Sequence, residues 1–262
     1  MRSNARGRCN PPRTQVNMIT KVSRDSLLRI DLVLFDVDDT LVNVASGLEY
    51  GVRRTLAQMG IDYSSELETR LLDSVTKRIG VEKRLYEIRV LLGLREVFGR
   101  NPFRTLEFAA RTLVWLNEVR SFLCQPVPGA SETLAFLKEN GYKVGVVSDM
   151  PASKFRLMSS RIQLLRNLDV YVTRSDVSAT KPSPQGILLA LNRLGVPPER
   201  AAYVGNFPSD VVAGKNAGTH TIFIPGRLAS YFELKGIHPP ADFTLGSLRE
   251  LSGLLTKSKE LN

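Results

Sequence analysis

Short apolar runs recur along this chain, once near residue 32 and four times after residue 140. They span residues 32–35, 142–147, 168–172, 201–204 and 221–224. Each run is mostly apolar at consecutive positions, as is typical of strands that are buried on both faces of a parallel sheet. The pattern therefore predicts five strands of one buried parallel sheet.

Helical patterns lie between these runs, over residues 131–140, 152–167 and 183–194. Gly141 and Gly195 follow two of them, where a left-handed residue commonly ends a helix. Before the last pattern, Ser183 is expected to be the N-cap and Pro184 the first helical residue. Strands that alternate with helices predict an α/β protein with a doubly wound, Rossmann-like parallel sheet.

Polar residues follow several predicted strands, at the sheet edge where open α/β proteins bind ligands. They are Asp36, Asp38 and Thr40; Ser148 and Asp149; Lys181 in a later loop; and Asn206 and Asp210. A buried strand that ends in acids is costly unless these acids are solvated, paired or bound to a cation. Asp36 and Asp38 can converge on one site as nucleophile and proton carrier.

A simpler interpretation is that Asp38, Asp39 and Thr40 supply only turn chemistry after the first strand. A single Ser, Lys or Asp in a loop is also usually structural. However, several such residues at one edge of one sheet favour a functional site.

The polar residues resemble the four motifs of the haloacid dehalogenase superfamily, whose members are mostly phosphate-ester hydrolases. The first motif, DxDx[TV], matches residues 36–40, and the second matches Ser148 after an apolar strand. The third matches Lys181, which Pro182 follows, and the fourth matches residues 205–210. The resemblance covers roughly residues 30–252 and implies an α/β core with a small all-α cap inserted after the first strand.

The resemblance also implies a mechanism. Asp36 would attack phosphorus and form an aspartyl-phosphate, while Asp38 would protonate the leaving oxygen and later deprotonate the hydrolytic water. Ser148 and Lys181 would bind the phosphoryl group, with Asp149 beside them. The substrate would be a small phosphorylated metabolite.

Mg²⁺ is the implied cofactor, because attack of an anion on an anion needs nearby cations. Its ligands would be Asp36, the carbonyl of Asp38, and Asn206 and Asp210 of the fourth motif. The family usually has an acid at the position of Asn206. Two unit charges about 4 Å apart interact by about 4 kcal/mol at an effective dielectric of 20, less where solvent screens them. Losing one anionic ligand is therefore expected to weaken metal binding. Asp210 could compensate by binding the ion directly or through a water.

Asn206 leaves three interpretations open. The first is retained Mg²⁺-dependent activity, and the second is a weak or inactive member that binds phosphate compounds. The third is the metal-independent dehalogenase branch, but that branch lacks an acid at the position of Asp38.

The insertion between Thr40 and Pro128 contains no convincing strand. Apolar residues recur at helical spacing in three groups: Leu71, Leu72, Val75 and Ile79; Leu85, Ile88, Leu91 and Leu92; and Leu106, Ala109, Leu113 and Leu116. This pattern predicts about four helices with buried stripes, Trp115 among the packing residues. We expect a tail at 1–29, a core at 30–42 and 127–255, and a cap at 43–126. Substrate choice is expected near residues 43–50 and at a cap arginine.

The composition excludes several other classes of protein. No apolar run in the 262 residues approaches the roughly 20 needed to cross a bilayer. Cys9 and Cys124 are far apart and only two histidines are present, so neither a disulfide framework nor a zinc site is indicated. A reducing, cytoplasmic setting is the simplest interpretation.

The net charge of +10 is concentrated at the N-terminus. Residues 1–30 hold seven basic residues and one acid, which leaves +4 for the remainder, a mildly basic body that suits anionic substrates. The tail is expected to be disordered. It could be a solvated tail without a role, a transit peptide, an RNA-contacting arm, or residues upstream of a start at Met18.

The sequence thus supports a Mg²⁺-dependent, phosphoglycolate-phosphatase-like phosphohydrolase. The alternative is a catalytically weak or regulatory phosphate-binding protein of the same fold. A receiver-type signalling domain is disfavoured, because such domains are shorter and lack a large helical insertion. Neither the substrate nor the oligomeric state can be inferred from the sequence.

Overall fold

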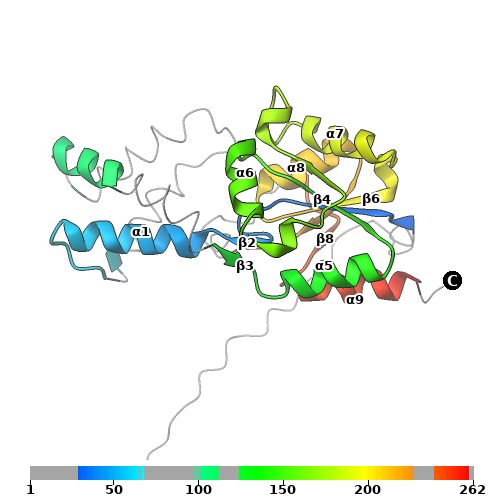
Figure 1. Ribbon diagram of the computed structural model, residues 1–262, viewed down its shortest axis with the longest axis horizontal. Helices are drawn as coiled ribbons and strands as arrows, with labels where there is room; N and C mark the ends of the chain where they lie inside the picture. Colours follow the sequence, from blue (N-terminus) through cyan, green and yellow to red (C-terminus); the bar gives the residue numbers. More distant parts are fainter. Residues whose placement is uncertain are drawn as a thin grey trace, which may run out of the picture.

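The computed structural model describes residues 29–64, 66–67, 98, 101–111, 124–226 and 239–259. Helices lie on both faces of a six-stranded parallel sheet (Figure 1). The strands are β1 (Leu32–Phe35), β2 (Val42–Asn43), β3 (Gln125–Pro126), β4 (Lys143–Val147), β5 (Val170–Val172), β6 (Ala201–Gly205), β7 (His220–Phe223) and β8 (Phe243–Thr244). The helices are α1 (Ala45–Gln58), α5 (Ala130–Glu139), α6 (Ala152–Ser159), α7 (Gln185–Leu194), α8 (Pro208–Ala217) and α9 (Arg249–Lys259).

The strand order is β5-β4-β1-β6-β7-β8, with every neighbouring pair parallel. From β1 the sheet extends through β4 to β5, and the chain then returns to the other side of β1 for β6, β7 and β8. This order confirms the predicted doubly wound sheet. It also puts a topological switch point at β1, where open α/β sheets bind ligands.

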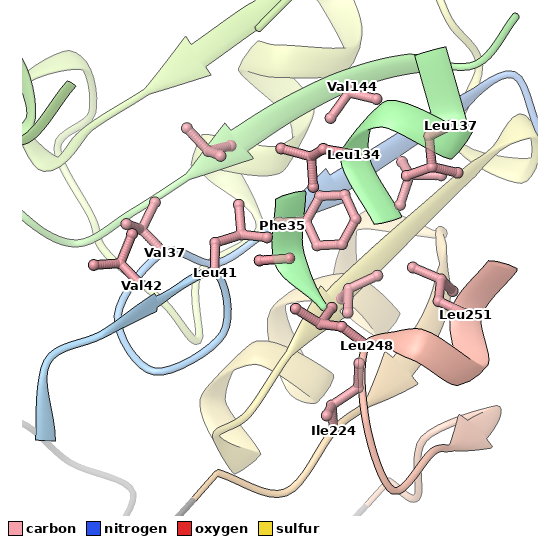
Figure 2. Packing of buried hydrophobic residues seen from close by; sticks show 14 of the residues in the cluster. Phe35, Val37, Leu41, Val42, Leu134, Leu137, Val144, Ile224, Leu248 and Leu251 are labelled. Atoms are coloured by element: carbon pink, nitrogen blue, oxygen red, sulfur yellow. The ribbon is translucent and has the colours of Figure 1, made fainter. Parts of the chain in front are cut away.

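The alternation of β1 explains the two helix layers. Val33 and Phe35 join the apolar cluster that includes residues of α5, α6 and α9. Leu32 and Leu34 point to the opposite face and join the cluster formed with α7 and α8. Figure 2 shows the first cluster, in which Phe35 lies close to Leu134 of α5. Because both faces are covered, the strand is apolar at every position.

The register of the sheet aligns the strand ends. Phe35, the last residue of β1, pairs with Val146 of β4 and Val204 of β6. The residues that follow these strands therefore emerge at the same edge, beside one another. Parallel pairing thus brings the polar segments after residues 35, 147 and 205 together.

The inserted segment begins and ends at a short antiparallel ribbon in which β2 pairs with β3. In the described part of the insertion, α1 and residues 102–111 are helical. Leu56 and Phe108 are buried in a separate apolar cluster between these helices. The predicted stripe was wrong at Leu106, whose side chain is 65% exposed, because packing against α1 selects Phe108 instead.

The stripes at residues 71–92, together with Leu113, Trp115 and Leu116, lie outside the described residues, as do residues 1–28 of the tail. The division into tail, core and cap stays a prediction.

The pattern over residues 152–167 does not form one helix. Helix α6 ends at Ser159, and a short 3₁₀ turn follows at Gln163–Leu165. Ser159 Oγ donates to the carbonyl of Arg156, and Ser160 Oγ donates to that of Leu157. Such local side-chain bonds compete with helical hydrogen bonding and favour a helix end.

Other predicted boundaries shift slightly. Pro184 is the N-cap of α7 rather than its first residue, although Ser183 Oγ still accepts from the backbone N–H of Gln185. Gly195 has φ of 63°, as its predicted role at the end of α7 requires. Strands β2, β3 and β8 escaped prediction because each has two residues, so the expectation of no strand between Thr40 and Pro128 was wrong at the two ends of that segment.

Candidate active site

Lys181 reaches the end of β1 from a distant loop and forms a buried cluster of charges there. Its Nζ lies 2.5 Å from Asp36 Oδ1 and 2.7 Å from Asp210 Oδ1. Lys181 and Asp36 are each 6% exposed, and Asp210 is 2% exposed. Three predicted site residues from separate segments therefore meet at the switch point of the sheet.

The charges in this cluster do not balance. Burial raises the pKa of Asp36 to about 7; the Lys181 ammonium opposes this rise, and the carboxylates of Asp210 and Asp38 add to it. Burial also lowers the pKa of Lys181, but Asp210 and Asp36 outweigh it and raise this pKa well above the usual value. The lysine thus stays charged, whereas burial and the two neighbouring carboxylates oppose ionisation of Asp36.

Asp210 is held by its own helix. Its Oδ2 accepts from the backbone N–H groups of Asn206 and Phe207, which lie at the N-terminus of α8. A carboxylate at this end of a helix is stabilised by free N–H groups. Asp210 therefore presents Oδ1 to Lys181 in a fixed position.

Gly205 makes this arrangement possible. A Cβ at Gly205 would lie 2.4 Å from Asp210 Cβ and 2.5 Å from its Cγ. The carboxylate folds back over the end of β6, where only a glycine leaves space.

The acids in the turn after β1 have different roles. Asp39 adopts φ of 59°, and its Oδ1 accepts from the backbone N–H of Val44 at 2.7 Å. Asp39 thus supplies the turn chemistry that the simpler interpretation assigned to the whole segment. Thr40 Oγ lies 3.5 Å from Asp36 Oδ2, too long for a strong hydrogen bond, and Thr40 is buried.

Ser148 and Asp149 follow β4 at the same edge. Ser148 is buried, and its Oγ accepts from the backbone N–H of Met150 at 3.2 Å, so its own proton is available to an acceptor. Asp149 Oδ1 accepts from the backbone N–H of Lys181 at 3.2 Å. Its carboxylate therefore fastens the loop that carries the lysine.

Tyr203 is the residue at this site that the sequence patterns missed. Its hydroxyl lies 3.1 Å from Lys181 Nζ and 3.1 Å from the carbonyl oxygen of Val147. The residue is in the middle of an apolar strand, which predicts only core packing. The signal available in the sequence was the hydroxyl of Tyr203 within an otherwise apolar strand, because a buried tyrosine hydroxyl usually has a hydrogen-bond partner.

Comparison with known proteins identifies the family. The model of the haloacid dehalogenase-like hydrolases matches residues 30–218, well over half of the chain. The chain belongs to this hydrolase family. The predicted resemblance is therefore confirmed.

The curated proteins similar to this hydrolase include a phosphatase and a pyrophosphatase. It is 32% identical to a phosphoglycolate phosphatase from Aquifex aeolicus, over 86% of the chain and 96% of the relative. It is 28% identical to the pyrophosphatase PpaX from Bacillus cereus, over 87% of the chain and 98% of the relative. The chain is thus a phosphatase-type member of the family.

Solved structures support the fold. YfnB from Bacillus subtilis, in a structure bound to magnesium, has a TM-score of 0.65 at 16% identity. The comparison covers 87% of this hydrolase and 99% of YfnB. No helix among the described residues combines the length and apolar character needed to cross a membrane.

The oxygen atoms at this site are of the types that bind Mg²⁺ in proteins. Asn206 Oδ1 is buried without a hydrogen-bond partner among the described residues, at the end of the strand beside β1. Within the same residues, no three His, Cys, Asp or Glu side chains are placed to hold a metal. An amide oxygen, one carboxylate, a backbone carbonyl and waters nevertheless satisfy Mg²⁺, which needs only one or two carboxylates.

Proposed function

We propose that this chain is a Mg²⁺-dependent phosphohydrolase that acts on a small phosphorylated metabolite through an aspartyl-phosphate. The observation that carries the proposal is the buried contact of 2.5 Å between Asp36 Oδ1 and Lys181 Nζ at the sheet's switch point. A carboxylate nucleophile needs a cation beside it when the reacting group is itself an anion.

In the first step, a carboxylate oxygen of Asp36 attacks phosphorus as the bond from phosphorus to the leaving oxygen breaks. The protonated carboxyl of Asp38 gives its proton to that oxygen. The positive charge of the Lys181 ammonium stabilises Asp36 by direct contact and the phosphoryl oxygens by electrostatic attraction at longer range.

In the second step, the Asp38 carboxylate takes a proton from a water that attacks phosphorus. The bond between phosphorus and Asp36 breaks, which releases phosphate and restores the enzyme. The Ser148 hydroxyl donates a hydrogen bond to a phosphoryl oxygen in both steps, since its Oγ already accepts from Met150. Asp149 contributes by holding the backbone of Lys181.

Asp36, the carbonyl of Asp38 and the amide oxygen of Asn206 would hold Mg²⁺. When bound, the ion supplies positive charge that ionises Asp36 and shields the phosphoryl oxygens. Asp210 would take part through water, because its oxygens already bind the start of α8 and Lys181.

Residues 43–126 would form a cap over the site, with 30–42 and 127–255 as the core. Closure of the cap would exclude water from the first step. The ribbon of β2 and β3 joins the two parts and is the natural hinge. Phosphoglycolate is the first substrate to test, given the relative from Aquifex aeolicus, within a screen that also holds sugar phosphates, nucleotides and pyrophosphate. The cytoplasmic setting stays a prediction.

A second candidate function is a weak or regulatory phosphate-binding protein. Asn206 favours it, because a neutral ligand replaces the usual acid and weakens attraction for the metal.

Turnover of p-nitrophenyl phosphate separates the two functions. The wild type is expected to need Mg²⁺, and Asp36→Asn is expected to lose at least about 10³-fold in kcat. Equal rates for the two proteins would favour the binding function instead.

A further inference from the structure

The ammonium of Lys181 is fully occupied by protein groups. It has three N–H donors and no acceptor. Nζ donates to Asp36 Oδ1 at 2.5 Å, to the Tyr203 hydroxyl at 3.1 Å and to the Val147 carbonyl oxygen at 3.5 Å, and it forms an ion pair with Asp210 Oδ1 at 2.7 Å. Two of these four oxygens belong to acidic groups of the candidate site, and the other two belong to neutral groups.

The chemistry of the groups determines the direction of each hydrogen bond. Lysine only donates, so the Tyr203 oxygen accepts from Lys181. A backbone carbonyl only accepts, so the Tyr203 O–H donates to Val147. The hydroxyl thus joins Lys181 to the last residue of β4, directly before Ser148.

The side chain of Tyr203 has fewer rotatable bonds than the long side chain of Lys181. The tyrosine is 1% exposed within β6, whose ladder pairs it with Leu34 of β1. Lys181 has a long, flexible stem and lies in a loop between β5 and α7. A fixed hydroxyl in the sheet can therefore restrict where the ammonium lies.

We propose that Tyr203 is a positioning residue that holds the Lys181 ammonium against Asp36, a role that rests on the proposed phosphohydrolase function. Without the hydroxyl, Lys181 loses one acceptor and Val147 loses a donor in a buried site. The ammonium is then expected to shift away from Asp36. A displacement of about 1 Å at a reacting centre can lower the catalytic rate roughly 10²-fold.

Tyr203→Phe tests this role, with Tyr142→Phe as the matched control. Tyr142 is also buried beside the sheet, but it packs in the cluster on the opposite face. Tyr203→Phe is expected to lower kcat for p-nitrophenyl phosphate by about tenfold or more, and to raise KM by a smaller factor. The control is expected to keep wild-type kcat. Thermal unfolding of both variants checks that they fold.

A second measurement does not depend on turnover. In a ¹H–¹⁵N spectrum of lysine ammonium groups, the Lys181 signal is identified by its loss in Lys181→Arg. Tyr203→Phe is expected to speed its proton exchange with water roughly fivefold or more, because one hydrogen bond is missing.

The outcomes separate this inference from the proposed function. Exchange and kcat that match those of Tyr142→Phe would overturn the role of Tyr203 while wild-type turnover upholds the hydrolase. A wild type that hydrolyses no phosphate ester would overturn the proposed function, and the exchange rates would still decide whether Tyr203 holds the ammonium.

Discussion

At the scale of single residues, the described part of the site holds more buried negative charge than Lys181 balances. Asp36 and Asp210 share the ammonium of Lys181, and Asp38 lies nearby. Asn206, being neutral, keeps the excess smaller than an aspartate would. As a proposed Mg²⁺ ligand, a neutral Asn206 would also attract the ion less than an aspartate, so charge balance and metal affinity would be opposed at this position.

Asn206→Asp is expected to tighten Mg²⁺ binding about tenfold, because it adds a carboxylate whose attraction is partly screened. The Mg²⁺ concentration for half-maximal activity and the Mg²⁺ dependence of thermal unfolding both measure this change. Asn206→Ala is the control and should weaken binding. An unchanged titration curve in both variants would remove Asn206 from the metal site.

Gly205→Ala is expected to destabilise the protein by about 1–3 kcal/mol and to lower activity, because its Cβ must displace the Asp210 carboxylate. Urea unfolding measures the first effect. Gly253→Ala is the control: among the described residues, no atom outside its own helix turn lies within 4 Å of its new Cβ, and alanine favours the helix α9. Equal stability of the two variants would contradict the close approach of Asp210 to β6.

At the scale of elements, a buried carboxylate fastens the edge of the sheet. Asp242, just before β8, accepts from the backbone N–H of Thr221 at 2.8 Å and from its hydroxyl at 2.9 Å. Its other oxygen pairs with Lys215 of α8. The two-residue strand β8 thus gains a connection to β7 and α8 that its own ladder is too short to provide.

The contacts of Asp242 with Thr221 and Lys215 predict that the protein loses stability in acid. Burial alone would raise the pKa of Asp242, but the hydrogen bonds from Lys215 and Thr221 outweigh burial and lower it below 3.8. The stabilisation is therefore fully present above the unfolded value of 3.8 and is lost as pH falls through the lower folded value. Asp242→Asn is expected to reduce the free energy of unfolding by about 1–3 kcal/mol at pH 7.

Urea unfolding between pH 3 and 7 measures the free energy of unfolding of wild type and Asp242→Asn. The difference between the two values should decrease below about pH 4. Glu107→Gln, which removes an exposed pair with Arg111, is the control and should change little at any pH. If the difference in free energy of unfolding between wild type and Asp242→Asn stayed constant with pH, Asp242 would not be ionised in its contacts with Thr221 and Lys215.

At the scale of the whole molecule, the sheet joins segments that are far apart in the chain. Residues that follow β1, β4 and β6 meet at one edge, and Lys181 reaches them from the loop between β5 and α7. Ligands at this edge would contact several segments at once, so binding and global stability are linked.

Mg²⁺ with inorganic phosphate, each at about 100 times its dissociation constant, is expected to raise the melting temperature by roughly 10–20 °C, since the two sites together add about 5.4 kcal/mol. Differential scanning fluorimetry against a sodium chloride control of equal ionic strength measures the shift. Identical melting curves with and without these ligands would contradict a site that binds both.

The hydrophobic pattern alone predicted the sheet and the acids at its edge. Runs that are apolar at consecutive positions indicate strands buried on both faces, and the carboxyl ends of parallel strands must share an edge. That reasoning located Asp36 and Asp210 near one another without coordinates. It could not find the end of α6 at Ser159 or the exposure of Leu106, because competing side-chain bonds and packing partners decide both.

The contacts that hold the site together depend on how the strands and helices pack. Tyr203 and Val147 are 56 residues apart, and their contact depends on β6 and β4 lying on either side of β1. Asp210 binds Lys181 because its helix begins at the end of β6. Periodicity reports which face of an element is buried, but the neighbours on that face follow from strand order, and strand order is a property of the whole packed chain.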